Sequence, residues 1–215
     1  MTTSTGTLPR LPRWLVHIVL RPANWVPAGF WLFLVFFQIA HAIEYPGVST
    51  FGLVAINTVA LVLFVTRRDA SRVGAFWEGA LAVAGTFVVS LLLLASKSDG
   101  ATLHDAPLIP TAIQCAGIIG WAVSLAALGR SLGIAPADRG LVRHGLYRFI
   151  RHPIYAFEAL FFLGWLIAVP NVGNAVIVTL WAALQIARIV REEKILGGYD
   201  DYRQNVRWRI IPFIW

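Results

Sequence analysis

Two short polar clusters hold the side chains best suited to chemistry in this otherwise apolar sequence. Their members are Tyr147, Arg151, His152, Tyr155, Arg188, Glu192 and Glu193. Pro153 lacks a backbone N–H and favours the first position of a helix, so Arg151 and His152 are predicted at a helix N-terminus. The unpaired N–H groups and the positive end of the helix dipole there suit a carboxylate or phosphate. The alternative is that these two residues only anchor the helix end in the lipid headgroup layer.

The second cluster forms a polar stripe on one predicted helix. Gln185, Arg188 and Glu192 are spaced i, i+3 and i+7, so they share one helical face. Charged side chains that reach into a bilayer usually line a cavity and serve function. The alternative is a simple Arg188–Glu192 ion pair at the headgroup level, which contributes little to stability.

Composition indicates a membrane protein rather than a water-soluble globule. Hydrophobic residues make up 58% of the 215 residues and charged residues only 13%, so a soluble fold would expose a large apolar area. The net charge of +7 comes from basic residues dispersed between apolar runs, a pattern that does not indicate nucleic-acid binding. The single cysteine, Cys115, lies in an apolar run, and the histidines show no metal-binding spacing. We therefore expect no disulfide framework and no metal site.

The apolar runs predict an all-α, polytopic membrane helix bundle of about six segments. The predicted segments are Trp25–Ile43, Thr50–Thr66, Ala75–Ala95, Leu108–Leu128, Ile154–Val169 and Ala175–Val190. Residues 1–24 are expected to be a flexible or interfacial start, residues 25–128 four membrane helices that form a scaffold and lipid-facing entrance, and residues 129–215 the region that carries the chemistry. The last two segments are joined by Pro170–Asn174 and are predicted to form a tight helical hairpin.

The basic residues predict the orientation of these segments. With six crossings, seventeen of the 18 Lys and Arg residues fall on one side of the membrane and only Lys97 on the other. Cytoplasmic loops are enriched in such residues. Both termini and both polar clusters are therefore expected on the cytoplasmic side, where the hairpin would bring Tyr147, His152, Tyr155, Arg188 and Glu192 around one pocket.

Several short motifs in a fixed order resemble a known superfamily. They are Leu141-Val142, Gly145-x-Tyr147, Arg151-His152-Pro153-x-Tyr155, Arg188-x-x-x-Glu192-Glu193-x-x-Leu196, Tyr199-x-x-Tyr202 and Ile211-Pro212. This order, with an apolar hairpin between the motifs, resembles the isoprenylcysteine carboxyl methyltransferase and phospholipid methyltransferase superfamily over about residues 139–213. The resemblance implies an integral membrane enzyme that transfers a methyl group from S-adenosylmethionine to an acceptor delivered from the bilayer.

The resemblance also implies roles for individual residues. The implied cofactor-binding residues are Gly140, Leu141, Val142, Tyr147, Arg151, His152, Pro153, Ile154, Tyr155 and Glu192. Arg188 would point toward the acceptor, which is a carboxylate, amine or thiol of a lipophilic or small apolar molecule. Arg151, His152 and the helix N-terminus suit the carboxylate of the cofactor, and Glu192 suits its ribose hydroxyls or ammonium group. The implied partners are this substrate and membrane lipids, the implied location is a bacterial inner membrane, and the sequence carries no signal for an oligomeric state.

Two features depart from the superfamily pattern and keep other functions open. The segment between Leu196 and Tyr199 is shorter than in much of the superfamily, which bears on how the tail closes over the cofactor. Glu158 follows Tyr155 by three residues, as an acid does in membrane sterol reductases that use NADPH, whereas Ile154 favours the methyltransferases. An NADPH-dependent reductase is therefore one alternative. A membrane scaffold without enzymatic activity, whose basic loops bind anionic lipids, is another.

Overall fold

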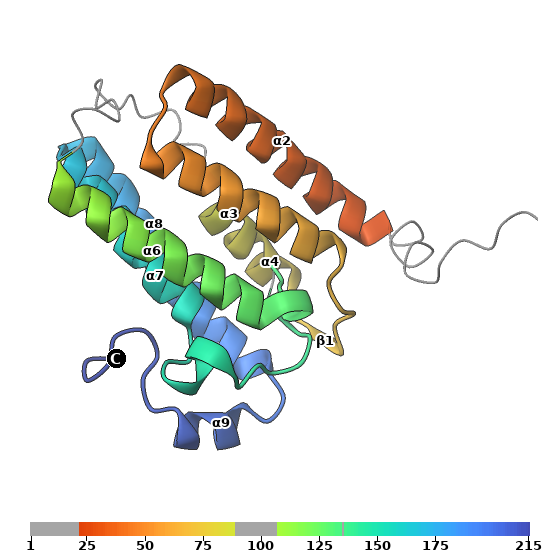
Figure 1. Ribbon diagram of the computed structural model, residues 1–215. Coiled ribbons are helices and arrows are strands. Elements are labelled where there is room, and N and C mark those ends of the chain that lie inside the picture. Colours follow the sequence, from red (N-terminus) through yellow and green to blue (C-terminus); the bar gives the residue numbers. More distant parts are fainter. Residues whose placement is uncertain (1–21, 89–106, 135) are drawn as a thin grey trace, which may run out of the picture.

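The computed structural model describes residues 22–88, 107–134 and 136–215, and these form a bundle of α-helices (Figure 1). The helices are α2 (Pro22–Glu44), α3 (Val48–Val65), α4 (Phe76–Val83), α6 (Leu108–Leu128), α7 (Pro153–Ala168), α8 (Val172–Ile195) and α9 (Tyr199–Asn205). Shorter elements are the π-helical turn η1 (Ala84–Val88), the 3₁₀ turns η2 (Gly129–Ser131) and η3 (Gly145–Arg148), and the strands β1 (Arg72–Val73) and β2 (Ala137–Asp138). The predicted helical fold is confirmed in the described part of the chain.

Three of the described helices are long and apolar enough to cross a bilayer: Val48–Val65, Leu108–Ser131 and Val172–Ile195. Trp31–Glu44 and Pro153–Ala168 are apolar but shorter. The chain is therefore an integral membrane protein. The third predicted segment begins as α4 and η1, and its remainder lies outside the described residues, so six crossings stay a prediction.

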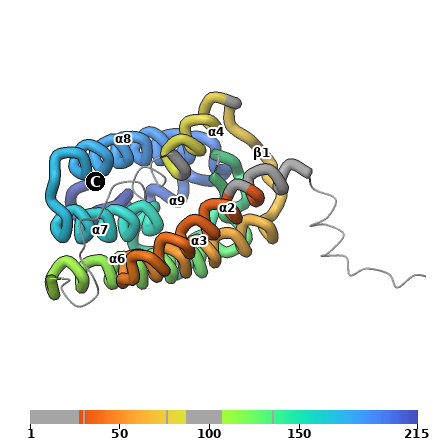
Figure 2. Tube along the Cα trace, turned by 90° about the horizontal axis from the view of Figure 1, so that it is seen from above, coloured from red at the N-terminus to blue at the C-terminus, as the bar shows by residue number. Residues whose placement is uncertain are grey.

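The helices pack as a chain of neighbours around α6. Helix α2 packs on α3, α3 on α6, α6 on α7 and α7 on α8, while α4 lies against α8. Figure 2 shows α2, α3 and α6 along one side of the bundle and α8 with α4 along the other. The close approach of α6 and α7 depends on small residues, because a Cβ atom at Gly117 would lie 2.6 Å from the backbone nitrogen of Phe161.

Aromatic and aliphatic side chains hold the two halves of the bundle. Trp31 of α2 and Phe64 of α3 are buried together, with ring centroids 5.6 Å apart. Phe162 of α7 and Trp181 of α8 are buried with centroids 4.7 Å apart. These contacts fix α7 against α8 and so set the relative positions of the polar residues on those helices.

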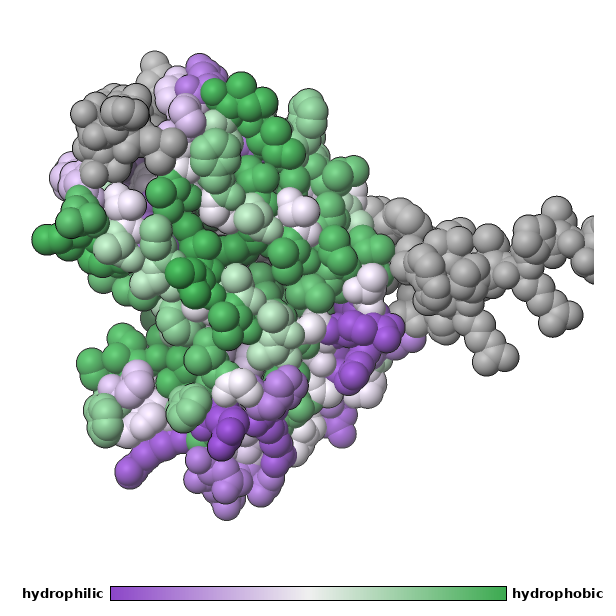
Figure 3. Space-filling view, in the orientation of Figure 1, coloured by the Kyte–Doolittle hydropathy of each residue, from purple (hydrophilic) through white to green (hydrophobic). Residues whose placement is uncertain are grey.

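The loops that follow α3 and α6 meet at one end of the bundle. Strands β1 and β2 are antiparallel, with Arg72 opposite Asp138, and the Arg68 N–H donates to the Arg130 carbonyl at 2.7 Å. The same end carries α9, and Figure 3 shows it as hydrophilic below a hydrophobic band that covers the helices. The described basic loops thus gather on one side, in agreement with the charge pattern of the sequence. That this side is cytoplasmic stays a prediction.

Candidate active site

The α7–α8 hairpin brings the two polar clusters together, as the sequence predicts. The turn is closed by Asn171, whose side chain accepts from the Asn174 N–H at 2.7 Å and caps α8. At the far end of the hairpin the Tyr155 hydroxyl donates to Glu192 Oε1 at 2.7 Å. His152 Nε2 lies 3.1 Å from Glu193 Oε1 on the same side. The predicted convergence of the start of α7 with the end of α8 is therefore present in the structure.

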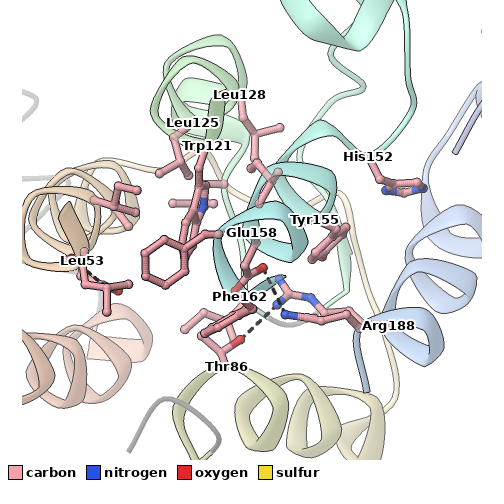
Figure 4. Close-up of a pocket in the computed structure, with 18 of the residues that line it drawn as sticks. Leu53, Thr86, Trp121, Leu125, Leu128, His152, Tyr155, Glu158, Phe162 and Arg188 are labelled. Carbon is pink, nitrogen blue, oxygen red and sulfur yellow. Dashed lines mark hydrogen bonds between the residues drawn. The ribbon is translucent and has the colours of Figure 1, made fainter. Parts of the chain in front are cut away.

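Arg188 is held from three directions. Its Nε donates to Glu192 Oε1 at 2.9 Å, its Nη1 to Thr86 Oγ1 at 3.1 Å, and its Nη2 to the Gly133 carbonyl at 2.8 Å. Thr86 belongs to the π-helical turn η1, an irregularity of a kind often found at functional sites. In Figure 4 the side chains of Tyr155, Glu158 and Thr86 surround the guanidinium group. Arg188 is thus fixed in one position by residues from three separate parts of the chain.

The Glu193 carboxylate contacts Arg151 and His152, the two residues that the sequence predicted to bind an anion. Its carboxylate accepts from the Tyr199 hydroxyl at 2.6 Å and from Arg209 at 2.9 and 3.0 Å. The Arg151 guanidinium lies 3.4 Å from the same carboxylate. Burial and the hydrogen bond to Glu193 raise the pKa of Tyr199 above its ordinary value. Glu193 therefore ties the start of α7 to the C-terminal tail, a role that the sequence did not indicate.

The C-terminal tail closes over this end of the site despite its short connection. Gly198 adopts a left-handed conformation (φ 70°) that turns the chain directly from α8 into α9. The Tyr202 hydroxyl donates to the Tyr147 carbonyl at 2.6 Å. The N–H groups of Arg151 and His152 donate to the carbonyls of residues 208 and 209 at 2.8 and 2.9 Å. The shorter Leu196–Tyr199 segment thus still permits closure.

Asp138 positions the loop that contains Gly140, Leu141 and Val142. Its two carboxylate oxygens accept from the backbone N–H groups of Gly140 and Gly197, each at 3.1 Å. Burial raises the pKa of Asp138, but these two hydrogen bonds, together with one from Ser71 and the charge of Arg72, hold the pKa below its ordinary value. Gly140 has φ 94°, a conformation that other residues rarely adopt, so the loop needs glycine there. Asp138 thereby joins the predicted cofactor loop to the end of α8.

These residues surround one cavity of about 420 Å³, a volume within the range of small-molecule sites. All of the predicted site residues line it except Pro153, which is buried at the start of α7. Those that line it are Gly140, Leu141, Val142, Tyr147, Arg151, His152, Ile154, Tyr155, Arg188 and Glu192. The cavity is also lined by residues spaced along α6, among them Thr111, Trp121 and Leu128, so it extends into the apolar part of the bundle. Pro153 therefore shapes the helix start rather than contacting the cavity.

Four cavity-lining side chains have buried polar atoms without a hydrogen-bond partner in the described part of the chain. They are Gln38 (Oε1), Arg139 (Nε), Arg151 (Nε) and Gln185 (Oε1). Such atoms are rare in folded proteins and call for an explanation, which a ligand can supply. The sequence placed Arg139 only among the basic loop residues, because its burial depends on how the loop folds. Burial lowers the pKa of Arg139, and the nearby charges of Asp69 and Glu192 oppose this effect.

The comparisons with known proteins agree with this geometry. The family model described as phospholipid methyltransferase matches residues 111–198, from α6 to the end of the α7–α8 hairpin. No curated protein matches the chain. The matched region contains most of the cavity-lining residues that the motifs predicted. Over residues 111–198, the chain is therefore similar to the phospholipid methyltransferase family.

Proposed function

We propose that the chain is an S-adenosylmethionine-dependent methyltransferase that acts on a lipophilic or small apolar acceptor. The observation that carries this proposal is the 420 Å³ cavity, which has charged and aromatic side chains at one end and extends along α6 between apolar helices. A soluble cofactor would enter from the polar end. An acceptor dissolved in the membrane would enter between the helices.

The residues at the polar end fit the chemical groups of the cofactor. The unpartnered Nε–H groups of Arg139 and Arg151 are donors suited to its carboxylate. Glu192 uses Oε1 for Tyr155 and Arg188, and its Oε2 would accept from ribose hydroxyls. Gly140 lines the cavity and leaves open space beside the backbone that a ligand could occupy, because a Cβ atom there would meet no atom nearer than 3.9 Å within the described residues. When bound, the cofactor supplies a methyl group on a positively charged sulfur.

The chain itself contributes position and a dry environment. Tyr147 and Tyr155 are buried aromatic residues that face the cavity, and aromatic faces attract cations such as the sulfonium group. Apolar walls from α6 and α7, including Trp121 and Phe162, exclude water along the acceptor path (Figure 4). Alignment of two reactants in a closed site accounts for a large share of the rate in bimolecular transfers.

The proposed orientation follows from charge. The loops that contain β1 and β2 lie at the end of the bundle that carries α9 (Figure 1), and cytoplasmic loops of membrane proteins are rich in Lys and Arg. We propose that the protein lies in a bacterial inner membrane and that this end, with the cofactor entrance, faces the cytoplasm. S-adenosylmethionine would then be drawn from the cytosol.

Calorimetric titration of the full chain in lipid nanodiscs with S-adenosylhomocysteine tests the proposal. We expect Arg139→Ala and Glu192→Gln to weaken binding about 10- to 100-fold, the range for loss of a hydrogen bond to a charged group. Arg203→Ala is the matched control, because Arg203 is exposed on α9 and lies outside the cavity. It should leave binding within about twofold of the original.

Three results would count against this function. The first is the absence of S-adenosylhomocysteine binding, and the second is equal binding by the Arg139→Ala and Arg203→Ala variants. The third is preferential binding of NADPH, which would favour the reductase alternative. Salt-sensitive binding to anionic lipid with no affinity for S-adenosylhomocysteine or NADPH would favour the scaffold alternative.

A further inference from the structure

A second polar pair lies deeper in the cavity than the proposed cofactor end. Glu158 lies one helical turn beyond Tyr155 on α7, and Gln185 lies one turn before Arg188 on α8. Both side chains line the cavity, and the Gln185 Nε2 donates to Glu158 Oε2 at 3.3 Å. Gln185 is only 4% exposed. The pair therefore stands between the cofactor end and the apolar path along α6.

The hydrogen bond between them fixes which way the Gln185 amide points. A carboxylate offers only acceptors, so the NH₂ group of Gln185 must face Glu158 and its carbonyl must point elsewhere. That carbonyl oxygen is buried and has no donor among the described residues. A buried, unpartnered acceptor costs free energy unless a ligand donates to it. Gln185 Oε1 and the Glu158 carboxylate together present hydrogen-bond acceptors to whatever occupies this part of the cavity.

Much of the donor capacity of Arg188 is already used at this point. Three of its five N–H groups donate, to Glu192, Thr86 and the Gly133 carbonyl. The positive charge of Arg188 is paired with Glu192, and Glu158 adds a further carboxylate next to it (Figure 4). A second negative charge in a cavity of low polarity is unfavourable beside Glu158. The local chemistry thus favours a donor over an anion.

We propose that Glu158 and Gln185 form the subsite that selects a methyl acceptor carrying N–H or O–H hydrogen, and that Glu158 takes the proton. This inference rests on the proposed function. The acceptor nitrogen or oxygen donates to Gln185 Oε1 and gives one proton to the Glu158 carboxylate. Its lone pair forms the new bond to the methyl carbon as the carbon–sulfur bond breaks, and that electron pair stays on sulfur. Glu158 later releases the proton to solvent through the polar end of the cavity.

Three probes of equal chain length distinguish the possible acceptors: dodecylamine, 1-dodecanol and dodecanoic acid. Their binding to the full chain in phosphatidylcholine nanodiscs is measured by quenching of the cavity tryptophans, and methyl transfer by radiolabelled S-adenosylmethionine. We expect the amine or the alcohol to bind at least about tenfold more tightly than the acid. Whichever of the amine and the alcohol binds more tightly identifies the donor group that the subsite accepts.

Variants of Glu158 separate a catalytic role from a structural one. Glu158→Gln should weaken binding of the preferred probe about tenfold and lower its methylation about 100-fold, the low end for loss of a positioned proton acceptor. S-adenosylhomocysteine affinity and the thermal unfolding temperature should stay unchanged. Glu158→Asp keeps a carboxylate and should restore most of the preference for the donor probe. Glu44→Gln is the matched control, because Glu44 is exposed at the end of α2 and lies outside the cavity.

Gln185→Ala gives an independent test should Glu158→Gln fail to fold. It should weaken the preferred donor probe about tenfold and leave dodecanoic acid unaffected. Preference of the unaltered protein for dodecanoic acid, equal affinities for all three probes, or variants that bind donors as well as the original would each overturn the inference. Loss of S-adenosylhomocysteine binding in the unaltered protein would instead overturn the proposed function.

Discussion

Removal of the Glu193 carboxylate is expected to release the C-terminal tail from the start of α7. Glu193 is 11% exposed and Arg151 is 9% exposed, so Glu193→Ala leaves a buried cation unpaired. Loss of one member of a buried ion pair costs about 3–5 kcal/mol. The bonds from Arg209, which is 31% exposed, add about 0–1 kcal/mol because solvent screens them. The total is about 3–6 kcal/mol, and about 1.4 kcal/mol corresponds to a factor of ten, so the tail should open about 100- to 20,000-fold more often.

Hydrogen-exchange mass spectrometry in nanodiscs measures this opening directly. We expect faster exchange in residues 147–155 and 199–215 and unchanged exchange in α3 and α6. Asp201→Ala is the matched control, because Asp201 pairs with Arg143 at 2.5 Å but is 65% exposed, and its loss should cost less than about 1 kcal/mol. The exchange rates of the Glu193→Gln variant should lie between those of Glu193→Ala and Asp201→Ala. Equal, small effects of Glu193→Ala and Asp201→Ala would refute the assignment of Glu193 as the buried anchor of the tail.

Three further changes test the packing and the loops. Asp138→Ala should speed hydrogen exchange in the loop of Gly140, Leu141 and Val142. Because the pKa of Asp138 is lowered in the folded state, the stabilisation by its carboxylate is present above the ordinary pKa of 3.8 and is lost as pH falls through the lowered pKa. The thermal unfolding temperature of the variant should therefore lack this decrease at acid pH. Gly117→Ala should destabilise the fold by about 1–3 kcal/mol, because the new methyl group meets the backbone of α7. Gly29→Ala is its control and should be neutral or stabilising in the same thermal assay, because a Cβ atom there has nothing within 4 Å. Tyr202→Phe should cost about 1 kcal/mol through loss of the bond to the Tyr147 carbonyl. Burial raises the pKa of Tyr202 to about 12, so its stabilisation is complete below pH 10 and is lost as pH rises through 12, and the variant should remove that alkaline loss.

The sequence predicted the helices of this protein well because their signals are local. Apolar runs of about 20 residues and the proline at the start of α7 determine where a helix lies without reference to the rest of the chain. The described helices α3, α6, α7 and α8 lie close to the predicted segments. The hairpin also followed from connectivity, since a short turn must return α8 along α7. This was enough to predict that Tyr155 and Glu192 meet.

Only the tertiary structure decided how the remaining polar groups are paired. Glu192 and Glu193 are adjacent in sequence, yet one faces Arg188 and the cavity while the other binds Arg151 and the tail. Successive residues on a helix point about 100° apart, so neighbours of the same type enter different surroundings. Which surroundings they meet depends on η1, on the loop after β2 and on the path of the tail, and these are held by contacts distant in the sequence. The sequence by itself thus determined where the chemistry gathers, and long-range packing determined which side chains are left free to perform it.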